Sequence, residues 1–159
     1  MRDKFTPEEW NALRQTPHLV VLAMATTGAS GVFGTIGEMF TAGRAIYEAS
    51  ASENELIRLL SAKEEAHAAQ DAVKEEIKDA DPEDVPTWLH QRSIAKVQQS
   101  LAILAMKAPE EQDAWRGWLR DLAKRIAESS TEGGFLGFGG ERVSEKERAY
   151  MSELEGALS

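Results

Sequence analysis

The chain has 159 residues, of which 42% are hydrophobic and 28% are charged, a balance typical of one folded globular domain rather than of a disordered segment. Its 18 Lys and Arg residues against 27 Asp and Glu residues give a formal net charge of −9, which repels phosphate backbones and anionic lipids, so neither nucleic acid nor a membrane is the expected partner. The absence of cysteine excludes disulfides, thiolate catalysis and cysteine-ligated metal sites.

The first predicted helix has an explicit start. Thr6 is followed by Pro7 and, three residues after Thr6, by Glu9, which is the pattern of an N-cap, a first-turn proline and a capping box. Phe5 and Trp10 stand on either side of this start at the positions of a hydrophobic staple. Residues 1–10 lack the apolar core and the cleavage site of a signal peptide, so we expect the chain to be cytoplasmic.

The most apolar part of the chain follows. Thr16 and Pro17 repeat the cap-plus-proline pattern, which predicts a break or a kink before the apolar run 19–25. That run is too apolar for a solvated face, so we expect it at the centre of the core. Residues 15–37 carry no Asp, Glu, Lys or Arg, but their four glycines and five Ser or Thr residues favour a buried helix and a loop over a membrane span.

Two further helices are predicted before the middle of the chain. Thr35 and Glu38 form a second capping box, from which we expect a helix to about residue 50. Ser52 and Glu55 form a third, and apolar residues then recur every three or four positions through one long helix that ends near residue 77.

Similar signals for the start and end of helices recur in the second half of the chain. Two prolines in the acidic stretch 79–86 interrupt the helical pattern, and Pro109 ends the next helix and opens another that returns antiparallel to it. Ser144 and Glu147 form a fourth capping box ahead of a last helix. No segment alternates with the two-residue period of a strand. We therefore predict an all-α fold, a single-domain bundle of about six helices over residues 1–159.

The two halves of the chain share a glycine pattern. Residues 31–38 and 134–141 both follow the order G-φ-φ-G-x-x-G-E, where φ is apolar, and each stands between predicted helices. One interpretation is an internal repeat of two related helix-loop-helix halves, 6–50 and 108–159. The other is a coincidence of glycines in two loops.

The glycine-rich segment 133–140 also carries Phe135, Leu136 and Phe138. One interpretation is that these side chains fold back to plug the end of the bundle, and the other is that they form a docking surface for a partner, a second protomer or a lipid interface. In both cases we expect the segment to be ordered, with Phe33 and Phe135 in one apolar cluster, because fixing a glycine-rich backbone requires compensating burial.

One pair of residues has the spacing of metal ligands. Glu64 and His67 form an E-x-x-H pattern, which places a carboxylate and an imidazole on one helical face, as in carboxylate-bridged di-iron bundles. Such a site needs two copies of the pattern, and neither His18 nor His90 has a glutamate three residues before it. We therefore prefer the alternative that Glu64 and His67 lie on a solvated helix face.

Motifs of nucleotide binding and nucleophilic catalysis are absent from the sequence. It contains no G-x-S-x-G elbow and no P-loop lysine, and both glycine-rich segments follow predicted helices, whereas dinucleotide-binding fingerprints follow strands. The acidic run 79–84 contains Pro82 and has Asp84 where a calcium loop needs glycine. The sequence therefore motivates no enzyme without excluding one, and it identifies no catalytic residue and no cofactor, with a divalent metal as the open alternative.

The end of the chain resembles a known family. Ile126 and Ala127, then Glu132 and Gly133, and then the stretch V-S-E-K-E at 143–147 precede an apolar-periodic helix. This order resembles the helix-loop-helix signature of TerB-like tellurite-resistance domains, in which an Ala-Asp-Gly loop is followed by a Ser-x-x-Glu helix start. The resemblance implies an all-α fold of two such halves, metal-ion binding and a role in stress-response complexes near membranes. It carries the metal-binding role to Glu132 and Glu147.

Two functions follow as hypotheses. We expect a helical interaction or scaffold module that forms a homodimer, because apolar and alanine-rich seams and four tryptophans favour packing one bundle against another. The alternative is a TerB-like metal- or small-ligand-binding protein that uses carboxylates such as Glu64 and Glu132 together with His67.

Overall fold

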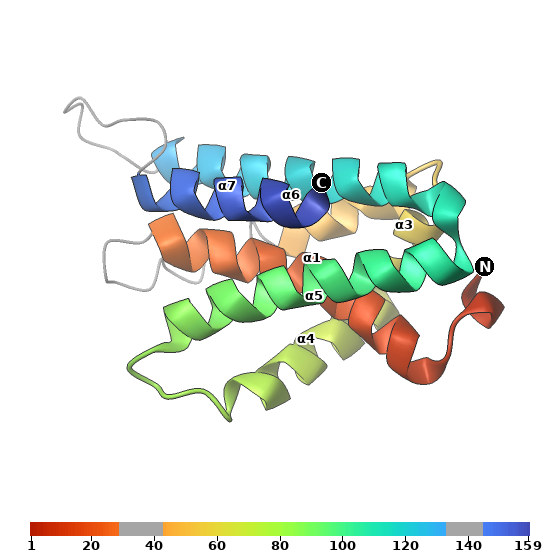
Figure 1. The fold of residues 1–159 in the computed structure, drawn as a ribbon, viewed down its shortest axis with the longest axis horizontal. Helices are drawn as coiled ribbons and strands as arrows, with labels where there is room; N and C mark the ends of the chain where they lie inside the picture. Colours follow the sequence, from red (N-terminus) through yellow and green to blue (C-terminus); the bar gives the residue numbers. More distant parts are fainter. Residues whose placement is uncertain (29–42, 133–144) are drawn as a thin grey trace.

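A computed structural model describes residues 1–28, 43–132 and 145–159 (Figure 1). The elements are η1 (Arg2–Lys4), α1 (Pro7–Gly28), a helical segment at 43–48, η2 (Ala49–Ala51), α3 (Glu55–Leu60), α4 (Lys63–Ile77), α5 (Val85–Lys107), η3 (Pro109–Glu111), α6 (Gln112–Glu132) and α7 (Glu145–Leu158). No strand occurs in these three ranges, and the predicted all-α bundle is confirmed.

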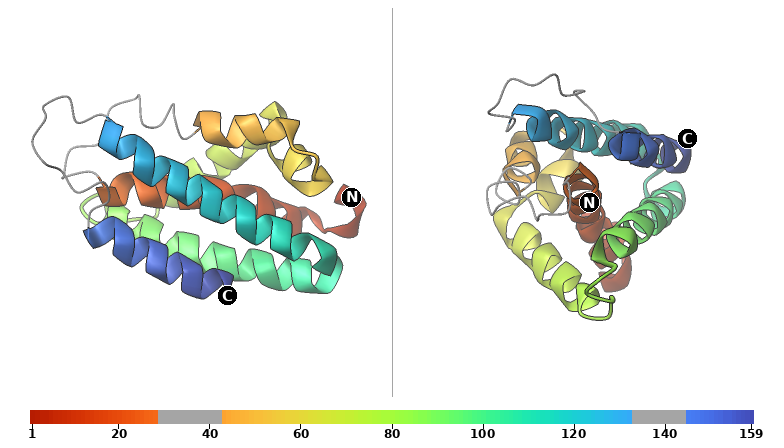
Figure 2. Two further views of the ribbon diagram at one scale, coloured as in Figure 1. Left: turned by 90° about the horizontal axis from the view of Figure 1, so that it is seen from above. Right: turned by 90° about the vertical axis from the view of Figure 1, so that its left-hand side faces the viewer.

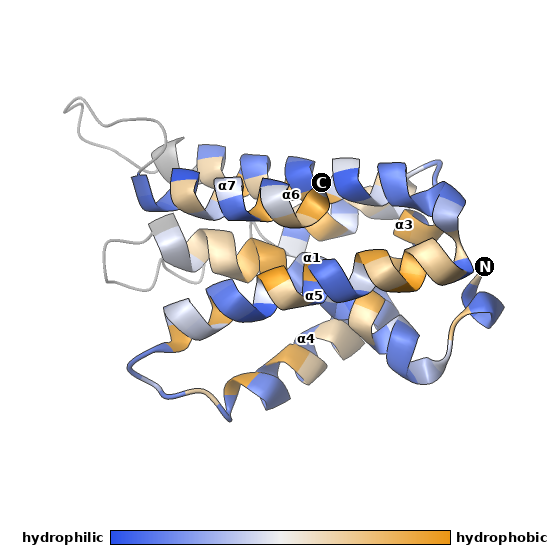
Figure 3. Ribbon diagram, viewed as in Figure 1, coloured by the Kyte–Doolittle hydropathy of each residue, from blue (hydrophilic) through white to orange (hydrophobic). Residues whose placement is uncertain are grey.

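Helix α1 lies at the centre of the bundle. It packs against α4, α5, α6 and α7, and the end-on view in Figure 2 shows these helices arranged around it. Its apolar run is buried, with Leu19, Val20 and Ala23 fully inaccessible to solvent. Figure 3 shows the same hydrophobic character along the middle of α1. The prediction that residues 19–25 form the centre of the core is therefore confirmed.

The start of α1 is built as predicted. The amide of Glu9 donates to Oγ1 of Thr6 at 3.2 Å, and the amide of Thr6 donates to Oε2 of Glu9 at 2.8 Å, which completes the capping box. The rings of Phe5 and Trp10 lie 5.8 Å apart, so the hydrophobic staple also forms.

Of the predicted break or kink at Pro17, the break does not occur, because α1 continues through this residue. A proline inside a helix removes one backbone hydrogen bond and costs about 3 kcal/mol. Buried side chains on both sides of Pro17, such as Leu13 and Leu19, hold the two halves of α1 in the same core. The hydroxyl of Thr16 also donates to the carbonyl of Ala12 at 2.8 Å, which keeps this polar group satisfied inside the bundle.

The predicted long helix after Ser52 is also wrong in detail. The cap is Asn54, whose Oδ1 accepts from the amide of Ile57 at 2.9 Å, and Ala62 adopts an extended conformation that separates α3 from α4. The break lets α3 and α4 each bury an apolar side of their own against the core, with Leu60 on α3 and Val73 on α4 as examples.

Helices α5 and α6 run in opposite directions, as predicted from Pro109 (Figure 1). The indole Nε1 of Trp115 on α6 donates to Oγ of Ser100 on α5 at 2.9 Å, inside the core. Helix α7 completes the bundle with Tyr150, Leu154 and Leu158 buried. None of the helices in the described ranges is long and apolar enough to cross a membrane.

Several sequence predictions fall outside the described residues. The Thr35 and Glu38 box, Ser144 and both copies of the shared glycine pattern belong to 29–42 and 133–144. The internal repeat therefore stays a prediction. The end of the second predicted helix is described, as the helical segment at 43–48 and the η2 turn that follows it.

Candidate interaction site

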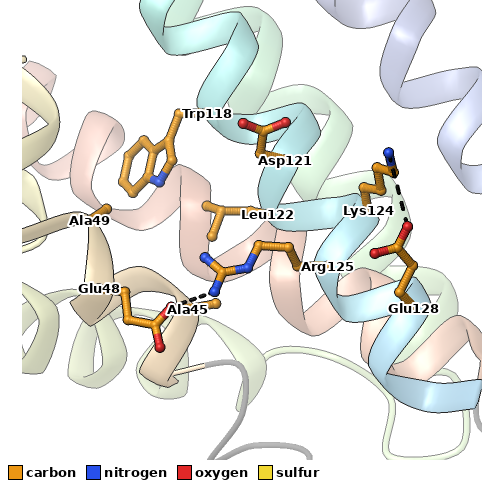
Figure 4. Close-up of a pocket in the computed structure, with 9 residues that line it drawn as sticks. All are labelled: Ala45, Glu48, Ala49, Trp118, Asp121, Leu122, Lys124, Arg125 and Glu128. Carbon is orange, nitrogen blue, oxygen red and sulfur yellow. Dashed lines mark hydrogen bonds and ion pairs between the residues drawn. The ribbon is translucent and has the colours of Figure 1, made fainter. Parts of the chain in front are cut away.

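A surface cleft of about 390 Å³ separates the helical segment at 43–48 and η2 from α6 (Figure 4). Its walls combine small apolar side chains, one indole and several charged groups. The lining residues are Ala45, Glu48, Ala49, Trp118, Asp121, Leu122, Lys124, Arg125 and Glu128.

The spacing of α6 explains which side chains reach the cleft. Trp118, Asp121, Arg125 and Glu128 recur at intervals of three or four residues, and Leu122 lies four residues after Trp118, so all five share one flank of the helix. Leu122 on this flank is buried, while Trp118 is partly buried and packs against the core. The helix thereby offers an apolar floor with charged groups beside it.

Trp118 is held firmly in place. Its ring packs edge-on against the fully buried Trp115, with centroids 5.4 Å apart and an angle of 62° between the rings. A tryptophan whose ring is fixed by its neighbours has little conformational entropy left to lose on binding. The part of its ring that lines the cleft is therefore a suitable anchor for a partner.

An ion pair bridges the cleft. Arg125 on α6 donates from Nη2 to Oε2 of Glu48, and Arg44 donates from Nε to Oε1 of the same carboxylate at 3.0 Å. These hydrogen bonds, with that from Arg125 the stronger influence, hold the pKa of Glu48 below its ordinary value. Figure 4 shows Arg125 extending from α6 toward Glu48 beside Leu122 and Ala45. Glu48 is thus ionised at neutral pH and anchors two guanidinium groups.

The chemistry of the cleft suits a protein partner better than a small molecule. Small-molecule sites are lined mostly by apolar and aromatic groups, whereas five of the nine lining residues here are charged. An apolar centre surrounded by charged groups is the usual anatomy of a protein–protein contact surface.

The helical periodicity after Pro109 places Trp118 on one apolar stripe with Trp115 and Leu122, and it singles out neither Arg125 nor Glu48. A signal was present in the sequence, because Trp118 shares its flank of α6 with Asp121 and Arg125. An aromatic residue beside charged residues on one helical flank is typical of the margin of a contact surface. The contribution of the 43–49 segment could not be seen, since it depends on tertiary packing.

The predicted metal ligands are placed as follows. Glu64 and His67 lie on α4 with exposed side chains, Glu132 is the last residue of α6, and Glu147 is buried in α7 at 3% exposure. Among the residues that the structure describes, no group of three or more His, Asp and Glu residues could hold a metal ion. The predicted contact residues Phe33, Phe135, Leu136 and Phe138 lie outside the described ranges.

Two polar clusters between neighbouring helices were not predicted. Glu76 on α4 accepts from Nε of Arg92 on α5 at 2.7 Å and lies 3.7 Å from Nζ of the buried Lys96. Burial alone would raise the pKa of Glu76, but the hydrogen bond from Arg92 and the charge of Lys96 bring it below its ordinary value. This cluster ties α4 to α5.

The second cluster joins α5 to α7 and contains a serine, a histidine and a glutamate. Oε2 of Glu153 lies 2.8 Å from Nε2 of His90, but the fully buried Ser93 bonds the hydroxyl of Tyr150 and the backbone carbonyl of His90 rather than the imidazole. A nucleophilic serine needs a base within hydrogen-bond reach and access to substrate. The cluster is therefore a structural contact between two helices.

Comparison with models of known protein families gives no match, and comparisons with curated proteins and with solved structures give no significant match either. The resemblance to TerB-like domains therefore stays a prediction from the sequence.

Proposed function

We propose that this chain is a non-catalytic helical interaction module that self-associates, with the cleft at Trp118 as its contact surface. The observation that carries the proposal is the partly buried Trp118, which packs against Trp115 and lines the cleft among charged side chains. Tryptophan and arginine are the residues most enriched among those that dominate binding energy at protein interfaces. Trp118 and Arg125 meet in this one cleft.

The balanced charges at the cleft favour a second copy of the chain as the partner. The cleft and the adjoining Arg44 present three acidic and three basic side chains, so the surface is close to neutral although the whole chain carries a formal charge of −9. Two identical chains repel each other through their net charge. A locally balanced surface is where that repulsion is weakest.

The test is the mass of the protein in solution as a function of concentration, measured by sedimentation velocity. We expect the wild-type mass to rise with concentration and Trp118→Ala to weaken the association constant by about tenfold or more, as for a dominant interface residue. Trp88→Ala is the matched control, because Trp88 is also partly buried against the core but lies on α5, outside the cleft. A wild-type chain that stays monomeric at about millimolar concentration would contradict the proposal.

A second contact surface rests on the sequence alone. We propose that Phe135, Leu136 and Phe138 contribute apolar contacts, either within the bundle or to a second copy. Replacing Phe135 and Phe138 together by Ser separates these cases. Reduced stability at every concentration indicates an intramolecular role, and a weaker dimer with an intact monomer indicates an interface. We expect the module to act in the cytoplasm, on the sequence features given above.

A further inference from the structure

We infer that two copies dock cleft to cleft about a twofold axis, and that Arg125 of each copy then bonds Glu48 of the other copy instead of its own. This inference rests on the proposed self-association and names the geometry by which it occurs. It assigns Arg125 and Glu48 a role in recognition as well as in the monomer.

The first argument is the symmetry of the charges. A twofold interface buries the same surface on both copies, so that surface must be complementary to itself. The acidic set and the basic set at this cleft are equal in number. They are Glu48, Asp121 and Glu128, and Arg44, Lys124 and Arg125. Each copy therefore presents equal numbers of acidic and basic groups to the other.

The second argument is the position of the ion pair. Arg125 belongs to α6 and Glu48 to the helical segment at 43–48, so their bond spans the cleft from one wall to the other (Figure 4). A partner that enters the cleft meets this bond. Opening it leaves the guanidinium of Arg125 and Oε2 of Glu48 at the rim, in position to bond their counterparts on the second copy, while Oε1 of Glu48 stays bonded to Arg44.

The third argument is that the exchange requires little free energy. The side chains of Arg125 and Glu48 are 52% and 40% exposed, and bonds between such exposed groups contribute little to the stability of a fold. Exchange replaces each intramolecular bond by an equivalent one between copies. The same two groups then exclude wrong partners, since like charges that face each other across an interface are repulsive.

Charge reversal tests the exchange. Arg125→Glu leaves two acidic groups at these positions, and Glu48→Arg leaves two basic groups. We expect each variant alone to self-associate at least tenfold more weakly than the wild type, because identical copies present like charges. A mixture of the two variants has both bonds restored between copies, so we expect a one-to-one heterodimer with an association constant within about threefold of the wild type. Native mass spectrometry of variants with different mass tags measures the composition.

The matched control is a second ion pair that joins α6 to another helix. Nε of Arg120 bonds Oε1 and Oε2 of Glu155 on α7 at 2.7 and 2.9 Å, with exposures of 42% and 51%, and neither residue lines the cleft. A mixture of Arg120→Glu and Glu155→Arg should show no preference for the heterodimer.

The outcomes separate the two proposals. A monomeric wild type contradicts the proposed function itself. An associating wild type whose Arg125→Glu or Glu48→Arg variant associates equally well or more tightly overturns only the exchange, as does a mixture without heterodimer. If either reversal prevents folding, as judged by circular dichroism, Arg125→Gln and Glu48→Gln replace them. Their effects on the dimer constant should then be non-additive, and additive effects overturn the inference.

Discussion

The hydroxyl oxygens of Ser93 on α5 and Tyr150 on α7 lie 2.7 Å apart in the buried interface between these helices. Since Ser93 donates its proton to the carbonyl of His90 at 2.8 Å, the Tyr150 hydroxyl is the donor in this bond. Burial raises the pKa of Tyr150 well above its ordinary value, although the bond with Ser93 acts in the opposite direction. Tyr150 is therefore a neutral donor that fixes α7 against α5.

This arrangement predicts that Ser93→Ala destabilises the protein more than Tyr150→Phe. The first change leaves the buried Tyr150 hydroxyl without a partner, at a cost of about 1–3 kcal/mol, whereas the second leaves Ser93 bonded to the His90 carbonyl and should cost about 0.5–1.5 kcal/mol. Urea unfolding at pH 7 measures both. The reverse order would show that Ser93 and Tyr150 do not bond as described.

Buried His18 predicts a loss of stability on mild acidification. Burial lowers the pKa of His18 from 6.5 to about 4. Between these values the unfolded chain binds a proton that the folded chain does not, so the free energy of unfolding falls as pH decreases. The part due to His18 is about 2 kcal/mol between pH 7 and pH 5.

The measurement is the difference in unfolding free energy between pH 7 and pH 5 for the wild type and for His18→Leu. We expect the variant to lose about 2 kcal/mol less than the wild type over this interval. His67→Leu controls for removing an exposed histidine. Equal losses in the wild type and His18→Leu would mean that His18 is protonated as easily in the fold as in the unfolded chain.

The Glu64 and His67 pair is expected to be part of the solvated face of α4. Both side chains are exposed, and the described residues supply no third ligand. We therefore predict that Glu64→Gln combined with His67→Ala changes the melting temperature by less than about 2 °C and leaves the metal content unchanged. Melts with and without EDTA, together with elemental analysis, check this. Stoichiometric metal that disappears in the double variant would instead favour the metal-binding hypothesis.

Local sequence signals predicted the fold where one short-range interaction decides the outcome. The capping box of Thr6 and Glu9 forms because its partners are three residues apart, and the distant ion pair of Glu9 with Lys107 uses the other carboxylate oxygen, Oε1. At Pro17 the same kind of signal predicted a break or a kink, and the break does not occur, since burial on both sides of the proline outweighs the lost backbone bond. At Ala62 the helical periodicity of the sequence continues, but the backbone is extended and ends the helix. This break lets α3 and α4 each pack their own apolar side against the core.

The candidate site was less predictable than the fold. Trp118 and Arg125 share one flank of α6, which is visible in the sequence, but Glu48 comes from a segment 77 residues away. Periodicity identifies the faces of a helix and does not identify which segment packs beside it. For the same reason the sequence did not show that Glu76 on α4 reaches Arg92 and Lys96 on α5.

The cluster of Glu76, Arg92 and Lys96 gives a prediction about the relative stabilities of three variants. Lys96 has a side chain that is 8% exposed, and its ammonium group lies 3.7 Å from Oε1 of Glu76. Burial lowers the pKa of Lys96, and the charge of Glu76 opposes this. Glu76→Gln removes the only carboxylate shown bonded to this ammonium group in the described residues, so we expect a loss of about 1–3 kcal/mol in the free energy of unfolding at pH 7.

Lys96→Met should cost less, because Glu76 keeps its 2.7 Å bond with Arg92 and the methionine side chain fills much of the same space with apolar atoms. The double variant, Glu76→Gln with Lys96→Met, should be more stable than Glu76→Gln alone, since no buried charge then lacks a partner. Urea unfolding of all four proteins gives the comparison. A double variant that is less stable than Glu76→Gln would mean that the Lys96 ammonium group finds another partner, and that Glu76 is not what keeps it in the bundle.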